Sequence, residues 1–203
     1  MDIFRTADEV WKGLTNVPIC LFAILFFILL KKEKAPLGKR MFFLLSWSSF
    51  LGACVHTFAF PAPVRRAVWV VLMAFLYLTV RAAFILFLAY GGGYESFLVK
   101  TKLPVLVSMG VCYAASAVLT LLDNDLDILI FGFWAAFWMV PIICKAFSEK
   151  KRYPRMRLII VILCGALACQ LVSTLLPPGI GVVGCHLLII ASLFFIYKLT
   201  ENT

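Results

Sequence analysis

Residues 41–60 read MFFLLSWSSFLGACVHTFAF, and this stretch decides the fold class. Twenty mostly apolar residues are enough to cross the ~30 Å hydrocarbon core of a bilayer as an α-helix. The same stretch carries three serines and His56, which are costly in lipid unless they face other helices or water. It therefore predicts a membrane-spanning helix whose polar residues point into a bundle.

The composition of the whole chain agrees with this interpretation. Of its 203 residues, 64% are hydrophobic and 14% are charged, whereas soluble domains have about 45–50% apolar and about 25% charged residues. The sequence predicts a single all-α domain over residues 1–203, a polytopic seven-transmembrane helix bundle. The seven predicted spans are residues 14–30, 41–60, 67–90, 103–122, 128–147, 158–176 and 180–198.

The Lys and Arg residues are distributed unequally between the two predicted sides of the membrane. Fourteen Lys and Arg fall on one side, in residues 31–40, 100–102 and 145–157 and at Lys198, whereas Arg5, Lys12, Arg65 and Arg66 fall on the other. Because cytoplasmic loops carry the excess of Lys and Arg, the N-terminus is predicted outside and the C-terminus in the cytoplasm. The net charge of +9 is thus mostly topological. We expect a plasma-membrane protein with membrane lipids as partners and no nucleic acid.

The segment before the first span has apolar residues at helical spacing. Ile3, Phe4, Ala7, Val10 and Trp11 would lie on one side of a helix. This spacing predicts an amphipathic helix in residues 1–13 on the outer membrane interface. A frayed chain terminus is the alternative.

Three polar residues fall at similar depths in different predicted spans. At a rise of 1.5 Å per residue, His56 lies ~22 Å, His186 ~21 Å and Gln170 ~18 Å from the cytoplasmic edge. We predict that they line one polar, outward-facing cavity that binds a ligand. Further candidates for the lining are Ser49, Ser116, Ser173 and Thr174. The alternative is that these groups only form hydrogen bonds between packed helices.

An acidic turn, DNDLD, occupies residues 123–127. Its three aspartates could bind a cation, but they lack the spacing of an EF-hand loop. Capping of the helix that follows is the favoured interpretation, since carboxylates stabilise a helix N-terminus.

Seven spans, an outer N-terminus and histidines in spans two and seven resemble the CREST superfamily, which includes alkaline ceramidases and the progestin and adiponectin receptors. In that family, zinc is held by a His of span two and a His-x3-His pair of span seven, with a Ser one turn before the first His and an Asp in span three. His56 and His186 match two of these positions. Gly52 replaces the Ser, Ile190 replaces the second His of the pair, and span three has no Asp. The resemblance implies a CREST-like bundle with an incomplete zinc motif.

Three classes of function follow from these observations. The first is a non-catalytic bundle that binds a lipid or a small apolar ligand, without a resident cofactor. The second is a metal-dependent lipid amidase or esterase, whose zinc would need a third ligand besides the histidines. The candidates for that ligand are Cys54, Cys169, Cys185 and the aspartates of residues 123–127. The third is a small transporter or channel, which the lack of an internal repeat and of acidic residues in the predicted spans disfavours.

Overall fold

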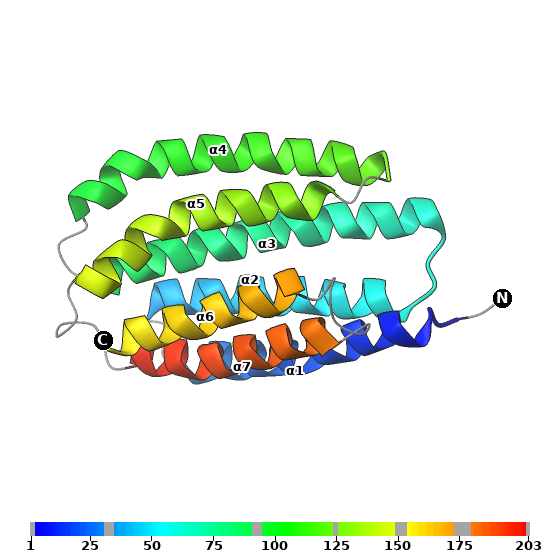
Figure 1. The fold of residues 1–203 in the computed structure, drawn as a ribbon, viewed down its shortest axis with the longest axis horizontal. Coiled ribbons are helices and arrows are strands. Elements are labelled where there is room, and N and C mark those ends of the chain that lie inside the picture. The colour runs from blue at the N-terminus through cyan, green and yellow to red at the C-terminus, as the bar shows by residue number, and fades with distance from the viewer. Residues whose placement is uncertain are drawn as a thin grey trace.

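Seven α-helices make up the computed structural model, which describes residues 3–30, 35–90, 95–123, 126–148, 154–172 and 180–201 (Figure 1). Each helix overlaps one of the seven apolar segments, and these ranges contain no strand, so the predicted all-α class is confirmed for them. The helices are α1 (Ala7–Leu29), α2 (Pro36–Thr57), α3 (Ala62–Tyr90), α4 (Glu95–Leu121), α5 (Leu126–Ser148), α6 (Pro154–Val172) and α7 (Ile180–Glu201).

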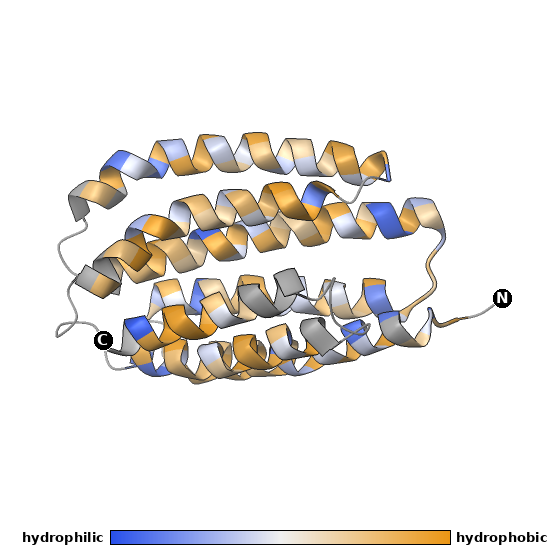
Figure 2. Cartoon of the chain, viewed as in Figure 1, coloured by the Kyte–Doolittle hydropathy of each residue, from blue (hydrophilic) through white to orange (hydrophobic). Residues whose placement is uncertain are grey.

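Five of these helices, α1, α3, α4, α5 and α7, are long and apolar enough to cross a membrane. The described apolar run of α6, Arg157–Ala166, is shorter, and α2 is less apolar because of its serines, Lys39 and Arg40. Hydrophobic residues occupy most of the length of the helices, whereas many hydrophilic ones lie near the helix ends (Figure 2). This distribution is that of a membrane protein.

The helices form a closed ring. Each packs against the next one along the chain, and α7 returns to pack against α1. Helix α3 also contacts α5 and is the most buried of the five long apolar helices. Because successive helices run in opposite directions, the two chain termini lie at opposite ends of the bundle (Figure 1). We call the end where α1 begins the N-terminal end; α3 and α5 also begin there, and α2 and α4 end there.

Aromatic side chains dominate the core around α3. Phe42 of α2 and Tyr77, Phe84 and Phe87 of α3 are all fully buried. Large apolar side chains also remain exposed, among them Phe133 and Phe137 of α5. Exposed apolar surface on this scale is unfavourable in water and favourable against lipid tails, as expected for a membrane bundle.

Helix α1 is continuous through residues 7–13, which the sequence analysis assigned to an interfacial helix. These residues form its first two turns, and they approach α2 closely at Gly13. A Cβ atom at Gly13 would overlap the hydroxyl oxygen of Thr57 and would lie 2.9 Å from the carbonyl oxygen of Ala53. The absence of a side chain at Gly13 therefore lets α1 and α2 touch through their backbones, and this contact brings the start of α1 to the end of α2.

Candidate functional site

A partly open cavity of about 250 Å³ lies at the N-terminal end of the bundle. Its walls come from the start of α1, the end of α2, the start of α3, the end of α4 and the start of α5. We call it the N-end cavity. Its lining residues are Arg5, Glu9, Val55, His56, Arg65, Arg66, Trp69, Thr120, Asp123 and Asp127.

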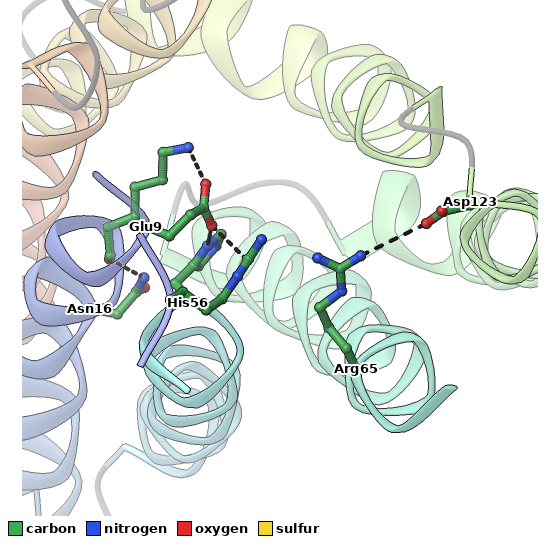
Figure 3. Close-up of polar contacts among 7 residues, drawn as sticks. Glu9, Asn16, His56, Arg65 and Asp123 are labelled. Atoms are coloured by element: carbon green, nitrogen blue, oxygen red, sulfur yellow. Dashed lines mark hydrogen bonds and ion pairs between the residues drawn. The ribbon is translucent and has the colours of Figure 1, made fainter. Parts of the chain in front are cut away.

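Glu9 of α1 is the centre of a charged cluster on one wall. Its carboxylate accepts hydrogen bonds from Arg5 Nη1 at 2.8 Å and from Lys12 Nζ at 2.6 Å. Lys12 stands three residues after Glu9 within α1, a spacing that places both side chains on the same helical face, whereas Arg5 precedes the helix. The His56 ring approaches from α2, with Nδ1 2.7 Å from Glu9 Oε2 (Figure 3). We call these four residues the Glu9 cluster.

The segment before α1 places Arg5 in this cluster. Phe4 and Phe58 form an antiparallel β-bridge, and their rings stack with centroids 6.0 Å apart. Arg5 N–H donates to the Thr57 carbonyl oxygen at 3.1 Å, and Ala59 N–H donates to the Ile3 carbonyl oxygen at 2.9 Å. These bonds tie the N-terminal segment to the chain just after α2, beside His56.

The opposite wall holds a pair of arginines that share one carboxylate. Arg66 Nη2 lies 3.0 Å from Asp123 Oδ2. Arg65 Nη2 lies 3.9 Å from Asp123 Oδ1, the contact drawn in Figure 3. Arg66 Nη1 also donates to the Leu121 carbonyl oxygen at 3.3 Å. The arginines begin α3 and Asp123 follows α4, so this contact depends on the packing of α3 against α4.

Asp127 forms the floor of the cavity. Its Oδ2 accepts hydrogen bonds from Trp69 Nε1 at 2.6 Å and from Thr120 Oγ1 at 2.7 Å, while Oδ1 accepts from Ile128 N–H at 2.7 Å. Asp127 therefore stabilises the first turn of α5, as capping by the acidic turn predicts, and also joins α5 to α3 and α4. Among the described residues, Asp123 contacts arginines instead, and Asp125 lies outside them.

Ser116, a predicted lining residue, is completely buried beneath this floor. Its hydroxyl donates to the Asp127 carbonyl oxygen at 3.1 Å and lies 3.0 Å from the Tyr77 hydroxyl. Since a hydroxyl has a single proton, Tyr77 is the donor to Ser116 in this arrangement. Ser116 thus supports the position of Asp127 and does not line the N-end cavity.

The two histidines both lie against α1 but contact different residues of it. His56 lines the N-end cavity, whereas His186 of α7 has Nδ1 2.6 Å from Thr15 Oγ1 and is not among the lining residues. Thr15 Oγ1 also lies 3.0 Å from the Lys12 carbonyl oxygen, which can only accept. Both contacts are satisfied when Thr15 donates to Lys12 and His186 donates from Nδ1.

Of the predicted lining residues besides the two histidines and Ser116, only Ser49 has a described side chain. Ser49 is buried within α2, away from the residues that line the cavity. Gln170 belongs to α6, but its side chain lies outside the described part of the structure, as do residues Ser173 and Thr174 altogether. The structure therefore places one predicted site residue, His56, in the N-end cavity, and Ser116 directly below it.

The surroundings of His56 do not suit a metal cation. A carboxylate on Nδ1 orients the ring and leaves Nε2 free, an arrangement also found around metal-binding histidines. Here, however, the same carboxylate is already bound by Arg5 and Lys12, whose positive charges would repel a cation. In the described ranges, no three His, Cys, Asp or Glu side chains are grouped so that they could hold a metal ion.

Most of the cavity was not predicted from the sequence, because its charged residues were interpreted as signals of membrane topology. No acidic residue falls within a predicted span, yet Glu9 belongs to the same helix as the first span and pairs with His56. One signal was present in the sequence. Residues 65–66 and 123–127 fall on the same predicted side and carry opposite charges, as partners in an ion pair do.

Comparison with known proteins assigns the chain to a family without indicating an activity. No curated protein and no solved structure matches the sequence. One family model matches residues 12–201, which include most of α1 and all of α2 to α7. The chain therefore belongs to the family described as Family of unknown function (DUF6962).

Proposed function

We propose that this protein is a seven-span plasma-membrane protein that binds a lipid or another small amphipathic ligand in the N-end cavity and does not catalyse a reaction. The N-terminus lies outside and the C-terminus in the cytoplasm, so the cavity faces outward. The observation that carries the proposal is the cavity itself: a space of about 250 Å³, lined by charged side chains, at the end of an apolar helical bundle.

The volume of the cavity supports a particular mode of binding. Sites that enclose a drug-sized ligand have volumes of about 300–1,000 Å³. A space of about 250 Å³ is smaller, and it suits the headgroup of a ligand whose apolar part remains in the surrounding bilayer. Trp69 lines the wall and donates to Asp127 through its indole N–H. Trp is common at the membrane–water interface, where its ring meets both environments.

The packing of α2 supports its role as a membrane span. Phe43, Trp47 and Phe50 are exposed and lie at spacings of four and three, so they share one face. The serines of α2, Ser46, Ser48 and Ser49, are buried. Polar side chains that face other helices and aromatic side chains that face outward are the arrangement expected of a helix in lipid.

Two further features support the proposed membrane orientation and the proposed ligand-binding function. Eight of the fourteen basic residues of the predicted cytoplasmic side are described, and they lie in helical turns toward the end of the bundle opposite the cavity. They are Lys39, Arg40, Lys100, Lys102, Lys145, Arg155, Arg157 and Lys198. The seven-helix ring and the resemblance to the CREST superfamily suggest the same class of function, a bundle that receives an amphipathic ligand among its helices.

Ligand binding can be tested with the purified full-length chain, after removal of bound lipid, by native mass spectrometry in the presence of membrane lipid extract. Val55 lines the cavity and is buried, so Val55→Phe should fill part of the space. We expect the wild type to retain a lipid and Val55→Phe to lose it. Val107 is exposed on α4 outside the cavity, so Val107→Phe is the matched control and should still bind.

Each variant must first show the wild-type elution volume and a cooperative thermal transition. Should Val55→Phe fail this check, Val55→Leu offers a smaller increase in volume at the same position. A wild type that retains no lipid, or a Val55 variant that binds as well as the Val107 control, would overturn the proposal.

A further inference from the structure

The charges around the N-end cavity are not equally satisfied, and this imbalance indicates which headgroup the cavity prefers. Glu9 accepts hydrogen bonds from three donors, and Asp127 accepts from three others. Both carboxylates are therefore occupied by groups of the protein. Of the acidic lining residues, this leaves Asp123 alone to balance the guanidinium groups of both Arg65 and Arg66.

Asp123 holds the two arginines weakly. Its side chain is 60% exposed, and its separation of 3.9 Å from Arg65 is too long for a hydrogen bond. Exposed ion pairs of this kind contribute little to stability because water screens the charges. The backbone of Asp123 has a φ of 60°, in the left-handed region that few non-glycine residues occupy. Because both ion pairs of Asp123 are exposed and one of them is long, a shift of its carboxylate loses little interaction energy.

Arg66 has unused capacity to donate hydrogen bonds. Its Nε atom is buried and has no acceptor among the described residues, and its bond to the Leu121 carbonyl oxygen is long at 3.3 Å. A buried donor without a partner is unfavourable. The planar guanidinium group matches the two oxygens of a phosphate or carboxylate, and such charge-assisted pairs are strong. An anionic oxygen in the cavity would satisfy this donor when the guanidinium group turns from Asp123 toward the cavity.

We propose that the N-end cavity selects an anionic headgroup, a phosphate monoester or a carboxylate, which Arg65 and Arg66 bind in place of Asp123. This inference rests on the proposed function, since it names the class of amphipathic ligand. Asp123 competes with the ligand for the arginines: it holds them in the empty cavity and releases them to the anion. On the opposite wall, Arg5 and Lys12 are held at 2.8 Å and 2.6 Å by the partly buried carboxylate of Glu9. The arginine pair, whose acidic partner among the lining residues is the exposed Asp123, is therefore the part of the cavity that is freer to bind an anion.

The test compares four probes on the purified full-length chain in neutral detergent, by isothermal titration calorimetry. The probes are dihexanoyl phosphatidic acid, dihexanoyl phosphatidylcholine, dihexanoylglycerol and inorganic phosphate. We expect phosphatidic acid to bind about tenfold more tightly than the other two lipids, because only its phosphate monoester is free to pair with both arginines. Inorganic phosphate should bind more weakly than phosphatidic acid, since it lacks the apolar part.

Variants separate the roles of the arginines and of Asp123. Arg66→Gln should weaken phosphatidic acid binding by about tenfold. Arg66→Lys should weaken it by less, because lysine keeps the positive charge but cannot donate two parallel hydrogen bonds as the guanidinium group does. Arg40→Gln is the matched control: Arg40 is exposed near the start of α2, at the opposite end of the bundle, and its loss should leave binding unchanged. Asp123→Asn should strengthen phosphatidic acid binding about threefold or more without affecting dihexanoylglycerol.

The outcomes distinguish the two proposals. Equal affinity for all three lipids, together with loss of binding in Val55→Phe, would overturn anion selectivity and leave lipid binding in place. Binding of inorganic phosphate as tight as that of phosphatidic acid would support the anion site and contradict an amphipathic ligand. Unchanged phosphatidic acid binding in Arg66→Gln, or weaker binding in Asp123→Asn, would exclude the exchange at the arginine pair. No binding of any probe would overturn both proposals.

Discussion

Glu9 and His56 are 47 positions apart in the chain, and their side chains meet with Oε2 and Nδ1 2.7 Å apart. This contact joins the first turn of α1 to the last turn of α2 at one wall of the N-end cavity. It is built on a backbone approach at Gly13 and on the bridge between Phe4 and Phe58. The geometry of the wall therefore depends on how α1 and α2 pack.

Replacement of Glu9 should destabilise the bundle. Glu9→Gln removes the carboxylate charge shared by Arg5, Lys12 and His56, and leaves partly buried cations without a counter-charge. We expect a loss of about 1–3 kcal/mol in the free energy of unfolding, measured by thermal or denaturant unfolding in detergent. Glu201 pairs with Lys198 in an exposed position at the opposite end of the bundle. Glu201→Gln should change stability by less than about 0.5 kcal/mol, and an equal loss in both variants would contradict the role of Glu9.

The close approach of α1 and α2 can be tested at three glycines. A Cβ at Gly13 would collide with Thr57 and the backbone of Ala53, whereas Cβ atoms at Gly110 and Gly132 would meet nothing within 4 Å. Gly13→Ala should lower the free energy of unfolding by about 1–3 kcal/mol, because the helices must move apart. Gly110→Ala and Gly132→Ala should be neutral or stabilising by up to about 1 kcal/mol, since alanine favours the helix. Similar melting temperatures for all three would refute the described contact.

The contact between Thr15 and His186 should couple α1 to α7. Thr15→Val removes the hydroxyl with little change in shape, and His186→Phe removes the ring nitrogens. In a double-mutant cycle we expect a coupling energy of about 0.5–1.5 kcal/mol, the size measured for hydrogen bonds between membrane helices. Strictly additive effects would show that the two side chains do not interact.

Orientation in the membrane can be measured by cysteine labelling in a background without the native cysteines. Asp123→Cys lies at the N-terminal end of the bundle and Arg40→Cys near the opposite end, and both positions are exposed. With the N-terminus outside, an impermeant thiol reagent should label position 123 in intact cells and position 40 only after the membrane is opened. The reverse labelling pattern would show that the N-terminus lies in the cytoplasm and that the cavity faces the cytoplasm, contrary to the proposed orientation.

Much of the fold follows from the sequence because a bilayer allows few structures. An apolar segment of about 20 residues must be helical in lipid, where each backbone polar group needs a partner within the segment. The predicted segments therefore coincide with helices to within a few residues at most ends. Residues 7–13 differ from the prediction. Their amphipathic pattern predicted an interfacial helix before the first span, but in the structure they are the first two turns of α1.

The candidate site was harder to predict, because depth along a helix can be counted from the sequence and direction around the bundle cannot. The counted depths placed His56 and His186 at one level, but in the structure the two rings contact different residues of α1: Glu9 meets His56 and Thr15 meets His186. The contact of Arg66 with Asp123 requires α3 and α4 to be neighbours, which no local pattern shows. A search for polar residues inside apolar segments identified His56. A search for opposite charges on the same predicted side of the membrane would also have identified Arg66 and Asp123.

The most direct test of the account is a structure of the full-length chain in lipid nanodiscs with dihexanoyl phosphatidic acid, determined by electron cryomicroscopy. The account predicts that Glu9 and His56 are in contact, and that density for the phosphate lies in the N-end cavity beside Arg66, with the acyl chains directed toward the bilayer. A map in which Glu9 and His56 are separated and side chains fill the cavity, or in which the lipid binds only elsewhere, would contradict it.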